Sequence, residues 1–302
     1  MSAQPDRRAG TIALIGAPNA GKSTLLNALL GAKLAIVSDK PQTSRRRLAG
    51  IVVAGTSQLV LVDTPGIFAP RRRLDRAMVE AAWRGAEDCD LALLVVDAAR
   101  WKGEETAAIV ARLERGRRRL ALALNKIDQV KRESLLAAAA GLHAALAPER
   151  VFMISALKGD GVEDLKRWLA EAVPSGPWLY PEDQLSDASE RVIAAELTRE
   201  QLYLQLRQEL PYAATVTTEQ WLGEEAKLVR IRQTVTVARP GQKGIVIGAK
   251  GARLKAIRTA AADAIAAWLG RRVDLTLHVR VREAWDEDPE TYRDLGLDRP
   301  PD

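Results

Sequence analysis

Nine consecutive residues, 16–24, have the types and spacing best suited to chemistry. They lie between an apolar run (residues 11–15) and a helix-favouring run (residues 25–30). They follow the pattern G-x-x-x-x-G-K-S/T, and they are Gly16, Ala17, Pro18, Asn19, Ala20, Gly21, Lys22, Ser23 and Thr24. A glycine-bounded loop between a strand and the start of a helix directs backbone N–H groups and the positive end of the helix dipole at phosphates. Lys22 is expected to reach the β- and γ-phosphates, and Ser23 is expected to ligate Mg²⁺. The pattern therefore predicts a site for a nucleoside triphosphate.

A second motif, Asn-Lys-Ile-Asp at residues 125–128, predicts which base this site holds. The Asp128 carboxylate can accept hydrogen bonds from both the N1–H and the 2-amino group of guanine. Adenine offers neither donor and would leave the carboxylate unpaired, at a cost of about 1–3 kcal/mol. Asn125 is expected to brace the loop, and the stem of Lys126 to cover one face of the base. After another apolar run, a backbone N–H for the guanine O6 is expected from Ser155, Ala156 and Leu157.

A third motif ends the apolar run 58–62 and is expected to face the γ-phosphate; it consists of Asp63, Thr64, Pro65 and Gly66. Asp63 would hold Mg²⁺ through a water, and the Gly66 N–H would bond the γ-phosphate only while that phosphate is present. Hydrolysis would then release residues 66 to about 80, which makes this segment a switch. Another hydroxyl for Mg²⁺ is expected from the preceding loop, where chemistry alone leaves Thr43 and Ser44 as alternatives.

The elements that must position these motifs alternate along the first half of the chain. Strand-like apolar runs cover residues 11–15, 58–62, 91–96, 120–124 and 151–154, and helical stretches cover 23–30, 73–87, 104–115, 132–146 and 161–172. This alternation predicts an α/β fold with a doubly wound, largely parallel sheet. Each nucleotide motif falls just after a strand, at the edge where such sheets bind ligands.

After a stretch rich in proline (residues 174–181), the pattern changes. It predicts a long helix (189–209), two strands (213–221 and 227–237), a helix–turn–helix segment (241–268) and a last strand (272–282). The turn is the G-x-x-G sequence Gly248, Ala249, Lys250 and Gly251, which is open enough for a nucleic acid backbone to approach closely. A G-x-x-G turn alone is usually only a helix connection, but the apolar run before it and Lys250 inside it favour RNA binding.

Charge is strongly polarised in this second half. Residues 227–282 hold thirteen Lys or Arg against two Asp or Glu, whereas residues 181–226 hold three against ten. A basic stretch between acidic flanks is typical of a directed site for a polyanion. Five basic residues around the turn are expected to contact RNA phosphates: Lys243, Lys250, Arg253, Lys255 and Arg258. The remaining residues of the turn, Gly248, Ala249 and Gly251, are expected to contact RNA as well.

With these motifs placed, the chain resembles the Era family of translation-associated GTPases from about residue 8 to about residue 297. The resemblance is carried by the nucleotide motifs, by residues 209–216 (ELPYAATV), by residues 241–251 (GQKGIVIGAKG) and by Thr43-Ser44-Arg45, which matches the family's T-T-R with Ser for the second Thr. It implies a GTP-binding domain at residues 8–175, a linker at 176–188 and an α+β type II KH domain at 189–297. It also implies binding to 16S ribosomal RNA near its 3′ end and a role in 30S subunit assembly and rRNA maturation.

No catalytic side chain can be assigned. Many small GTPases place a water-orienting glutamine directly after D-x-x-G; here Ile67 stands there, at a position that touches nucleotide but cannot orient water. Hydrolysis should therefore be slow without a partner. In related GTPases the P-loop asparagine holds K⁺, and Asn19 could do so or could merely brace the loop.

The sequence favours a GTP-hydrolysing, RNA-binding switch over two other functions. A scaffold that binds RNA and holds GTP without useful turnover stays open, because Ile67 is not a catalytic residue. A P-loop ATPase or small-molecule kinase conflicts with Asn125 and Asp128.

Composition places the chain among ordinary globular proteins, with 47% hydrophobic and 28% charged residues. Its single cysteine, Cys89, cannot form an internal disulfide and fits a reducing compartment. No run approaches the roughly 18 apolar residues that span a bilayer, so we expect a cytoplasmic protein, with peripheral contact to the inner face of the cell membrane left open. A monomer is expected, although the sequence does not determine the oligomeric state. His143 and His278 lack companions for a zinc site.

Overall fold

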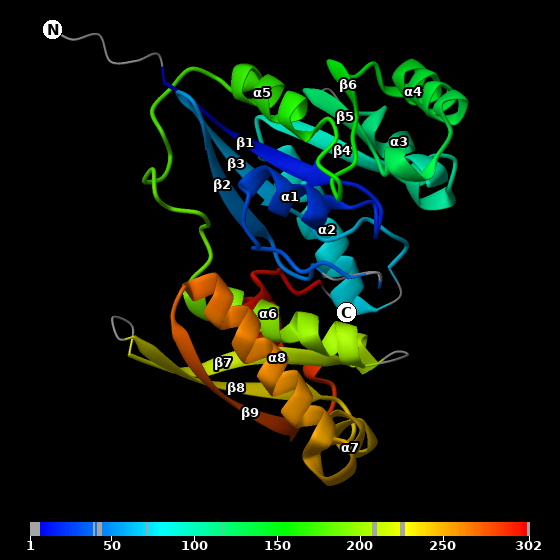
Figure 1. Cartoon of the computed structure of the whole chain (residues 1–302). Helices are drawn as coiled ribbons and strands as arrows, with labels where there is room; N and C mark the ends of the chain where they lie inside the picture. The colour runs from blue at the N-terminus through cyan, green and yellow to red at the C-terminus, as the bar shows by residue number, and fades with distance from the viewer. Residues whose placement is uncertain are drawn as a thin grey trace, which may run out of the picture. The chain divides into compact units, whose positions relative to one another are not determined.

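Strand β1 (Arg8–Ile15) lies inside a six-stranded sheet whose order is β2-β3-β1-β4-β5-β6 (Figure 1). The other strands are β2 (Leu48–Ala54), β3 (Ser57–Asp63), β4 (Leu91–Asp97), β5 (Leu120–Asn125) and β6 (Arg150–Met153). All neighbours pair in parallel except β2 and β3, which are antiparallel. The computed structural model describes residues 7–38, 40, 44–70, 72–116, 118–206, 210–223 and 227–300.

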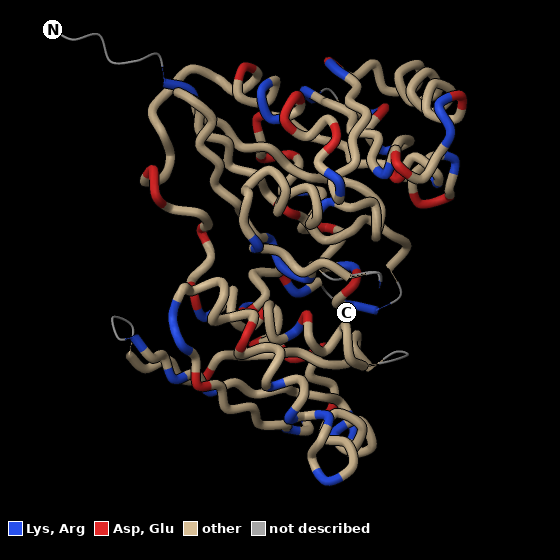
Figure 2. The backbone as a smooth tube through the Cα atoms, viewed as in Figure 1, with Lys and Arg blue, Asp and Glu red and all other residues tan. Residues whose placement is uncertain are grey.

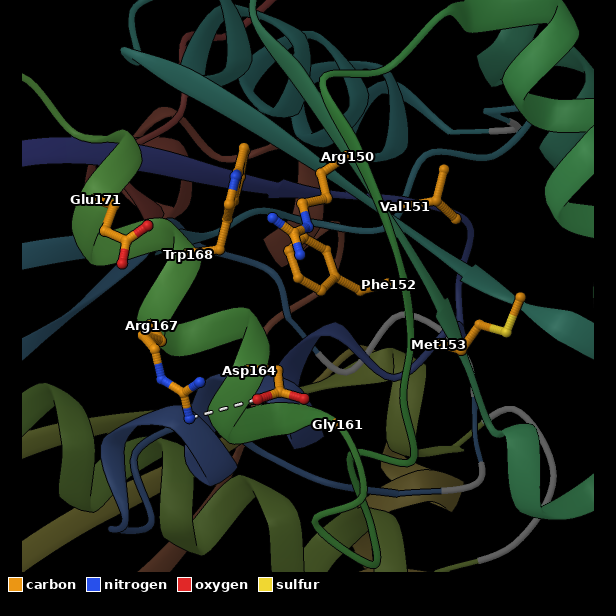
Figure 3. A pocket seen from close by; sticks show the side chains of 9 residues that line it. All are labelled: Arg150, Val151, Phe152, Met153, Gly161, Asp164, Arg167, Trp168 and Glu171. Atoms are coloured by element: carbon orange, nitrogen blue, oxygen red, sulfur yellow. Dashed lines mark ion pairs between the residues drawn. The ribbon is translucent and has the colours of Figure 1, made fainter.

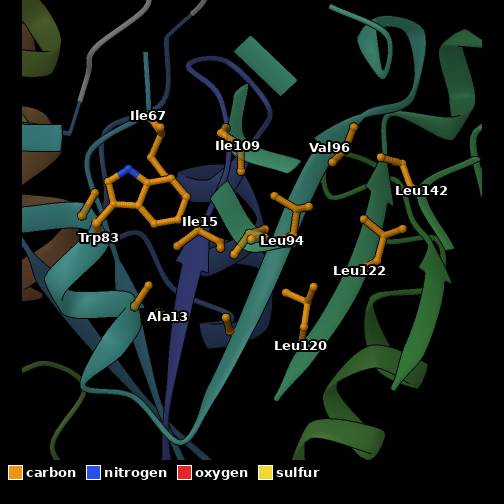
Figure 4. Close-up of a cluster of buried hydrophobic side chains, with 14 of the residues drawn as sticks. Ala13, Ile15, Ile67, Trp83, Leu94, Val96, Ile109, Leu120, Leu122 and Leu142 are labelled. Carbon is orange, nitrogen blue, oxygen red and sulfur yellow. The ribbon is translucent and has the colours of Figure 1, made fainter. Parts of the chain in front are cut away.

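The parallel strands are buried on both faces, which explains why their sequences are apolar runs without alternation. Helices α1 (Lys22–Leu30) and α5 (Val162–Ala172) contact β2 and β3, while α2 (Arg73–Glu87) and α4 (Arg132–Leu146) contact strands β1, β5 and β6. With α3 (Glu104–Leu113) packed on α4, the second layer encloses a cluster of buried side chains (Figure 4). The doubly wound sheet predicted from the sequence is confirmed.

Strand β2 is the main element that the sequence analysis did not predict. It pairs with β3 across the turn at Gly55, whose φ of 61° lies in the left-handed region that favours glycine. Its outer edge is covered by residues 185–187, since the Ile51 N–H donates to the Leu185 carbonyl (2.9 Å) and the Ser186 hydroxyl donates to the Ala49 carbonyl (2.7 Å). Part of the predicted linker is therefore held against the sheet, which satisfies an exposed strand edge.

A second, three-stranded sheet has the order β7-β8-β9, formed by β7 (Ala214–Leu222), β8 (Leu228–Val237) and β9 (Arg272–Val281). Strands β7 and β8 are antiparallel, and β8 and β9 are parallel because α7 (Pro240–Ile247) and α8 (Ala252–Leu269) form the crossover between them. Helices α6 (Glu190–Gln205) and α8 pack together and contact the edge strands. The order α-β-β-α-α-β agrees with the prediction; residues 207–209 of the predicted first helix lie outside the described part.

Contacts divide the chain into two compact units. Among the described residues, the first unit holds those up to Leu34, from Ser44 to Asp187 and from Leu295 onward, and the second holds residues 35–38, 40 and 188–294. The second unit includes most of a short helix that was not predicted, α9 (Pro289–Leu295). Within the described residues, no helix is both long and apolar enough to cross a membrane.

Candidate functional site: a phosphate loop, a base pocket and a basic turn

The loop between β1 and α1 has the backbone that its glycines predict. Gly16 and Gly21 have φ angles of 154° and 97°. A Cβ on Gly16 would lie 2.3 Å from the Val95 carbonyl oxygen, and one on Gly21 would lie 2.2 Å from Nδ2 of Asn125. Both glycines are therefore required by close approach of neighbouring strands as well as by φ. Helix α1 begins directly afterward, so its N-terminal N–H groups face the loop.

Lys22 is buried in this loop, with only 6% of its surface exposed. Its ammonium donates to the carbonyls of Gly16 and Ala17, both at 3.0 Å. Burial lowers the pKa of Lys22 to about 8, although the Asp63 carboxylate opposes the shift. The loop thus holds the lysine through neutral carbonyls, which a phosphate can replace with a stronger, charged partner.

Three oxygen-bearing side chains meet beside the loop. The hydroxyls of Ser23 and Ser44 both donate to Oδ2 of Asp63, at 3.0 and 2.9 Å, and the two hydroxyl oxygens are 3.1 Å apart. Asp63 ends β3 and is fully buried. A carboxylate and two hydroxyls form the hard oxygen set that Mg²⁺ prefers, so the residues present fit this ion. Of the two alternatives for the switch hydroxyl, Ser44 lies in this cluster, whereas Thr43 lies outside the described residues.

The segment after Asp63 is tied to the core and to the phosphate loop. The Thr64 hydroxyl donates to the Leu14 carbonyl (2.8 Å), and the Ile67 N–H donates to the Gly16 carbonyl (3.1 Å). The side chain of Ile67 is buried in the apolar cluster with Trp83 (Figure 4). It therefore has no means of orienting a water, in line with its hydrocarbon chemistry.

Asn125 joins the phosphate loop to the segment after β6. Its Nδ2 donates to the Ala20 carbonyl (2.9 Å), and its Oδ1 accepts from the Ala156 N–H (2.9 Å). The side chain is only 2% exposed, so both contacts are shielded from water. This is the bracing that the sequence predicted for Asn125.

Asp128 is held in place by Ser155 and Lys158. Its Oδ1 accepts from the Ser155 hydroxyl (2.7 Å), and its Oδ2 lies 3.8 Å from the ammonium of Lys158. The hydrogen bond from Ser155, followed by the backbone N–H of Asp128 and the charge of Lys158, holds the pKa of this carboxyl below its usual range. The group is therefore ionised and acceptor-only at neutral pH, as recognition of two guanine donors requires.

Two charged residues of this pocket, Lys158 and Asp97, are not predicted by the sequence motifs. The Asp97 carboxylate lies 2.7 Å from the ammonium of Lys126. One signal was present, because Asp97 is the first polar residue after the apolar run 91–96, at the carboxyl end of a strand beside β5. A hollow of about 440 Å³ lies elsewhere in the first unit, between β6 and α5, where Phe152, Trp168 and Arg150 line it (Figure 3). None of the predicted nucleotide residues lines that hollow.

In the second unit, the turn between α7 and α8 holds three residues with positive φ. Gly248, Lys250 and Gly251 have φ angles of 72°, 49° and 79°. The backbone strain at Lys250, which is not a glycine, is typical of a functional position. Its side chain is exposed at the tip of the turn.

Several Lys and Arg positions lie along the backbone around α7 and the turn that follows it (Figure 2). Lys250, Arg253 and Lys255 are exposed, and Lys243 and Arg258 are half-buried. Arg253 donates to the Ile245 carbonyl (3.1 Å) and Arg258 to the Leu275 carbonyl (3.3 Å). Within the part of the chain that is described, none of the five has an acidic partner, so their charge remains available to an anion.

A phosphate loop, an oxygen cluster suited to Mg²⁺ and a guanine pocket, followed by a G-x-x-G turn between helices, define a P-loop GTPase joined to a KH domain. Residues 11–126 match a family model described as "50S ribosome-binding GTPase", and residues 209–286 match one described as "KH domain". A third match, to a "Short chain dehydrogenase-like protein" over residues 89–174, covers only a part of the sheet that lacks the phosphate loop.

Full-length relatives agree with both matches. The chain is 54% identical over 293 residues to GTPase Era of Afipia carboxidovorans, covering 97% of this chain and 95% of the relative. It is 52% identical over 296 residues to GTPase Era of Mesorhizobium japonicum, covering 98% and 96%. The chain belongs to the Era family of GTPases, and its reaction is the hydrolysis of GTP to GDP and phosphate.

Two solved structures share the complete architecture. An Era variant from Aquifex aeolicus bound to GDP and AlF₄⁻ superposes with a TM-score of 0.89 at 33% identity, covering 96% of this chain and 99% of that one. Era in complex with MgGDPNP and nucleotides 1506–1542 of 16S ribosomal RNA superposes with a TM-score of 0.90, at the same identity and coverage.

Proposed function

We propose that GTP binds along the carboxyl ends of β1, β3 and β5, in contact with the twenty residues that the sequence motifs predict. The observation that carries this proposal is the pair of hydrogen bonds from Asn125 to the Ala20 carbonyl and from the Ala156 N–H to Asn125. They join the phosphate loop, the base motif and the Ser155–Leu157 segment into one rigid frame. A frame of this kind holds donors and acceptors in place before the nucleotide arrives, which reduces the entropic cost of binding.

Mg²⁺ is proposed to bind with the nucleotide at the cluster of Ser23, Ser44 and Asp63, the last through a water. Both hydroxyls donate their hydrogen to Asp63, which leaves the lone pairs of each hydroxyl oxygen available to a cation. When bound, Mg²⁺ neutralises charge that develops on the β- and γ-phosphates. Thr43 remains the alternative switch ligand.

K⁺ is proposed as a second cation at the phosphate loop, with the amide oxygen of Asn19 as a ligand. Asn19 has φ 59°, a conformation that Asn adopts more readily than most residues and that costs backbone strain. The strain supports a functional role, and the competing role of this side chain is to brace the loop.

The second unit is proposed to bind 16S ribosomal RNA near its 3′ end and so to act in 30S subunit assembly and rRNA maturation. The exposed Lys250 at the tip of the G-x-x-G turn supports binding of a nucleic acid backbone. The ribosomal target rests on the Era structure that holds nucleotides 1506–1542 of 16S ribosomal RNA. A cytoplasmic place, a monomeric state and peripheral contact with the cell membrane stay predictions from the sequence.

One multiple-turnover assay tests the switch as a whole. Turnover of GTP is measured with and without an RNA oligonucleotide of the 16S 3′ end, in KCl and in NaCl of equal concentration. We expect slow turnover alone, because Ile67 orients no water, and faster turnover with RNA and with K⁺. Equal rates with and without RNA would show that RNA binding to the second unit does not affect hydrolysis in the first. Equal rates in the two salts would show that Asn19 does not act through K⁺ and only braces the loop.

A further inference from the structure

Asp97 ends strand β4 directly beside Asn125 at the end of β5, in a parallel register that places both side chains at the nucleotide edge of the sheet. Its carboxylate is used twice. Oδ1 accepts from the Ala99 N–H (3.0 Å) at the start of the 3₁₀ turn Ala98–Arg100, and Oδ2 pairs with the Lys126 ammonium (2.7 Å). Only 12% of the Asp97 side chain is exposed, so the ion pair is partly shielded from water.

Lys126 needs such support for two reasons. Its backbone has φ 64° and ψ 37°, a left-handed conformation that costs a non-glycine residue about 1–2 kcal/mol. Its four-carbon stem also carries rotamer entropy of about 2 kcal/mol. A lysine whose stem is to lie flat under a base must lose that freedom, and a fixed anion at its tip removes it before the nucleotide binds.

We infer that Asp97 is a positioning residue of the guanine pocket, which anchors the Lys126 ammonium so that the lysine stem forms a ready-made floor for the base. The inference rests on the guanine site proposed above. Both oxygens of Asp97 are already used, by the Ala99 N–H and the Lys126 ammonium, so its effect on the base passes through Lys126.

The competing explanation is that Asp97 only caps the 3₁₀ turn. The two roles separate in Asp97→Asn, because an Asn carboxamide oxygen can still accept from the Ala99 N–H while the charge that holds Lys126 is lost. Asp97→Ala removes both contacts and serves as the matched comparison.

The test measures Kd for GDP and for IDP, which lacks the guanine 2-amino group, on the full chain with Asp97→Asn, Asp97→Ala, Lys126→Met and the double change Asp97→Asn with Lys126→Met. We expect Asp97→Asn to raise the Kd of GDP about fivefold, as for a partly buried ion pair. In the Lys126→Met background the same change should have an effect below about twofold, because the coupling is lost. The Tm of each variant measures how much the cap of the 3₁₀ turn, the hydrogen bond from the Ala99 N–H, contributes to stability.

The ratio of the two Kd values separates an effect through Lys126 from a displacement of Asp128, because IDP lacks the 2-amino group that Asp128 is proposed to bind; a changed ratio would overturn the inference. A floor under the base serves GDP and IDP alike, so Asp97→Asn should leave their ratio unchanged. The inference is overturned if Asp97→Asn binds GDP like the wild type, or if it weakens GDP equally with and without Lys126. If Asp128→Asn fails to shift preference to xanthosine nucleotides, the site assignment itself is wrong, and that outcome is distinct from a failure at Asp97.

Discussion

The two units of this protein both recognise phosphates, but they prepare for them in opposite ways. In the first unit Lys22 is buried and its ammonium already donates to two carbonyls, and the proposed Mg²⁺ ligands Ser23 and Ser44 donate hydrogen bonds to Asp63. In the second unit the cations around the G-x-x-G turn are mostly exposed and have no acidic partner among the described residues. An enclosed site concentrates binding energy in a few atoms, whereas an open basic surface adds small, salt-dependent contributions.

The glycines of the two loops show the same difference. A Cβ at Gly21 would lie 2.2 Å from Asn125, while a Cβ at Gly251 would meet nothing within 4 Å. Gly21 is required because the base motif packs against it, and Gly251 only because of its φ of 79°. The nucleotide loop is thus packed at both of its glycines, whereas the G-x-x-G turn is packed at Gly248, where a Cβ would lie 2.7 Å from Cβ of Arg253, and open at Gly251.

The largest effect should come from the enclosed cation. Lys22→Ala removes the only ammonium inside the described phosphate loop and should weaken GTP binding at least 100-fold, about 2.7 kcal/mol. RNA binding should not change, because the basic turn belongs to the other unit. Calorimetry with GTP and Mg²⁺ measures the first, and an RNA titration measures the second. The exposed Lys131→Ala on the same unit is the control, and tight GTP binding by Lys22→Ala would show that the loop is not the phosphate site.

The base pocket should respond nearly as strongly. Asp128→Asn replaces an acceptor-only carboxylate with an amide that presents a donor to guanine, and GTP binding should weaken by about 2–4 kcal/mol. Xanthosine triphosphate, whose O2 accepts, should gain affinity. Competition with a fluorescent guanine nucleotide measures both. Wild-type protein that binds ATP as tightly as GTP would contradict the guanine assignment.

Most of this fold could be predicted because each buried parallel strand is visible in the sequence as an uninterrupted apolar run, and several of these runs end in a motif. Strand β2 was missed because its pairing depends on the turn at Gly55 and on residues 185–187, far along the chain. Asp97 was missed for a related reason, since its role arises only when β4 and β5 lie side by side. The sequence thus predicts motifs whose residues are contiguous. It does not predict contacts between distant residues that form only when strands pair.

The open surface should give a smaller and salt-dependent effect. Lys250→Asp puts negative charge where the sugar-phosphate backbone must pass, so RNA affinity should fall at least tenfold, about 1.4 kcal/mol, and the salt dependence should flatten. GTP binding should be unaffected. Arg272→Asp makes the same charge change at an exposed position of β9 and is the matched control. If the two variants bound RNA equally well, the G-x-x-G turn would be only a helix connection.

The smallest effect tests whether burial of Lys22 has a measurable consequence. Because its pKa is lowered to about 8 in the nucleotide-free protein, its ammonium is lost as the pH rises through 8. Bound phosphates favour the charged form and raise the pKa, so GTP affinity is complete well below pH 8 and declines above it. From pH 7 to pH 8.5 the protonated fraction falls from about nine tenths to about one quarter, and the Kd of GTP should rise about fourfold. Lys22→Arg cannot lose its proton in this range, so its weaker binding should be independent of pH. A wild-type Kd that stays constant over the same range would show that the loop keeps its ammonium charged without a nucleotide. The cations of the two units would then differ in exposure but not in readiness to bind phosphate.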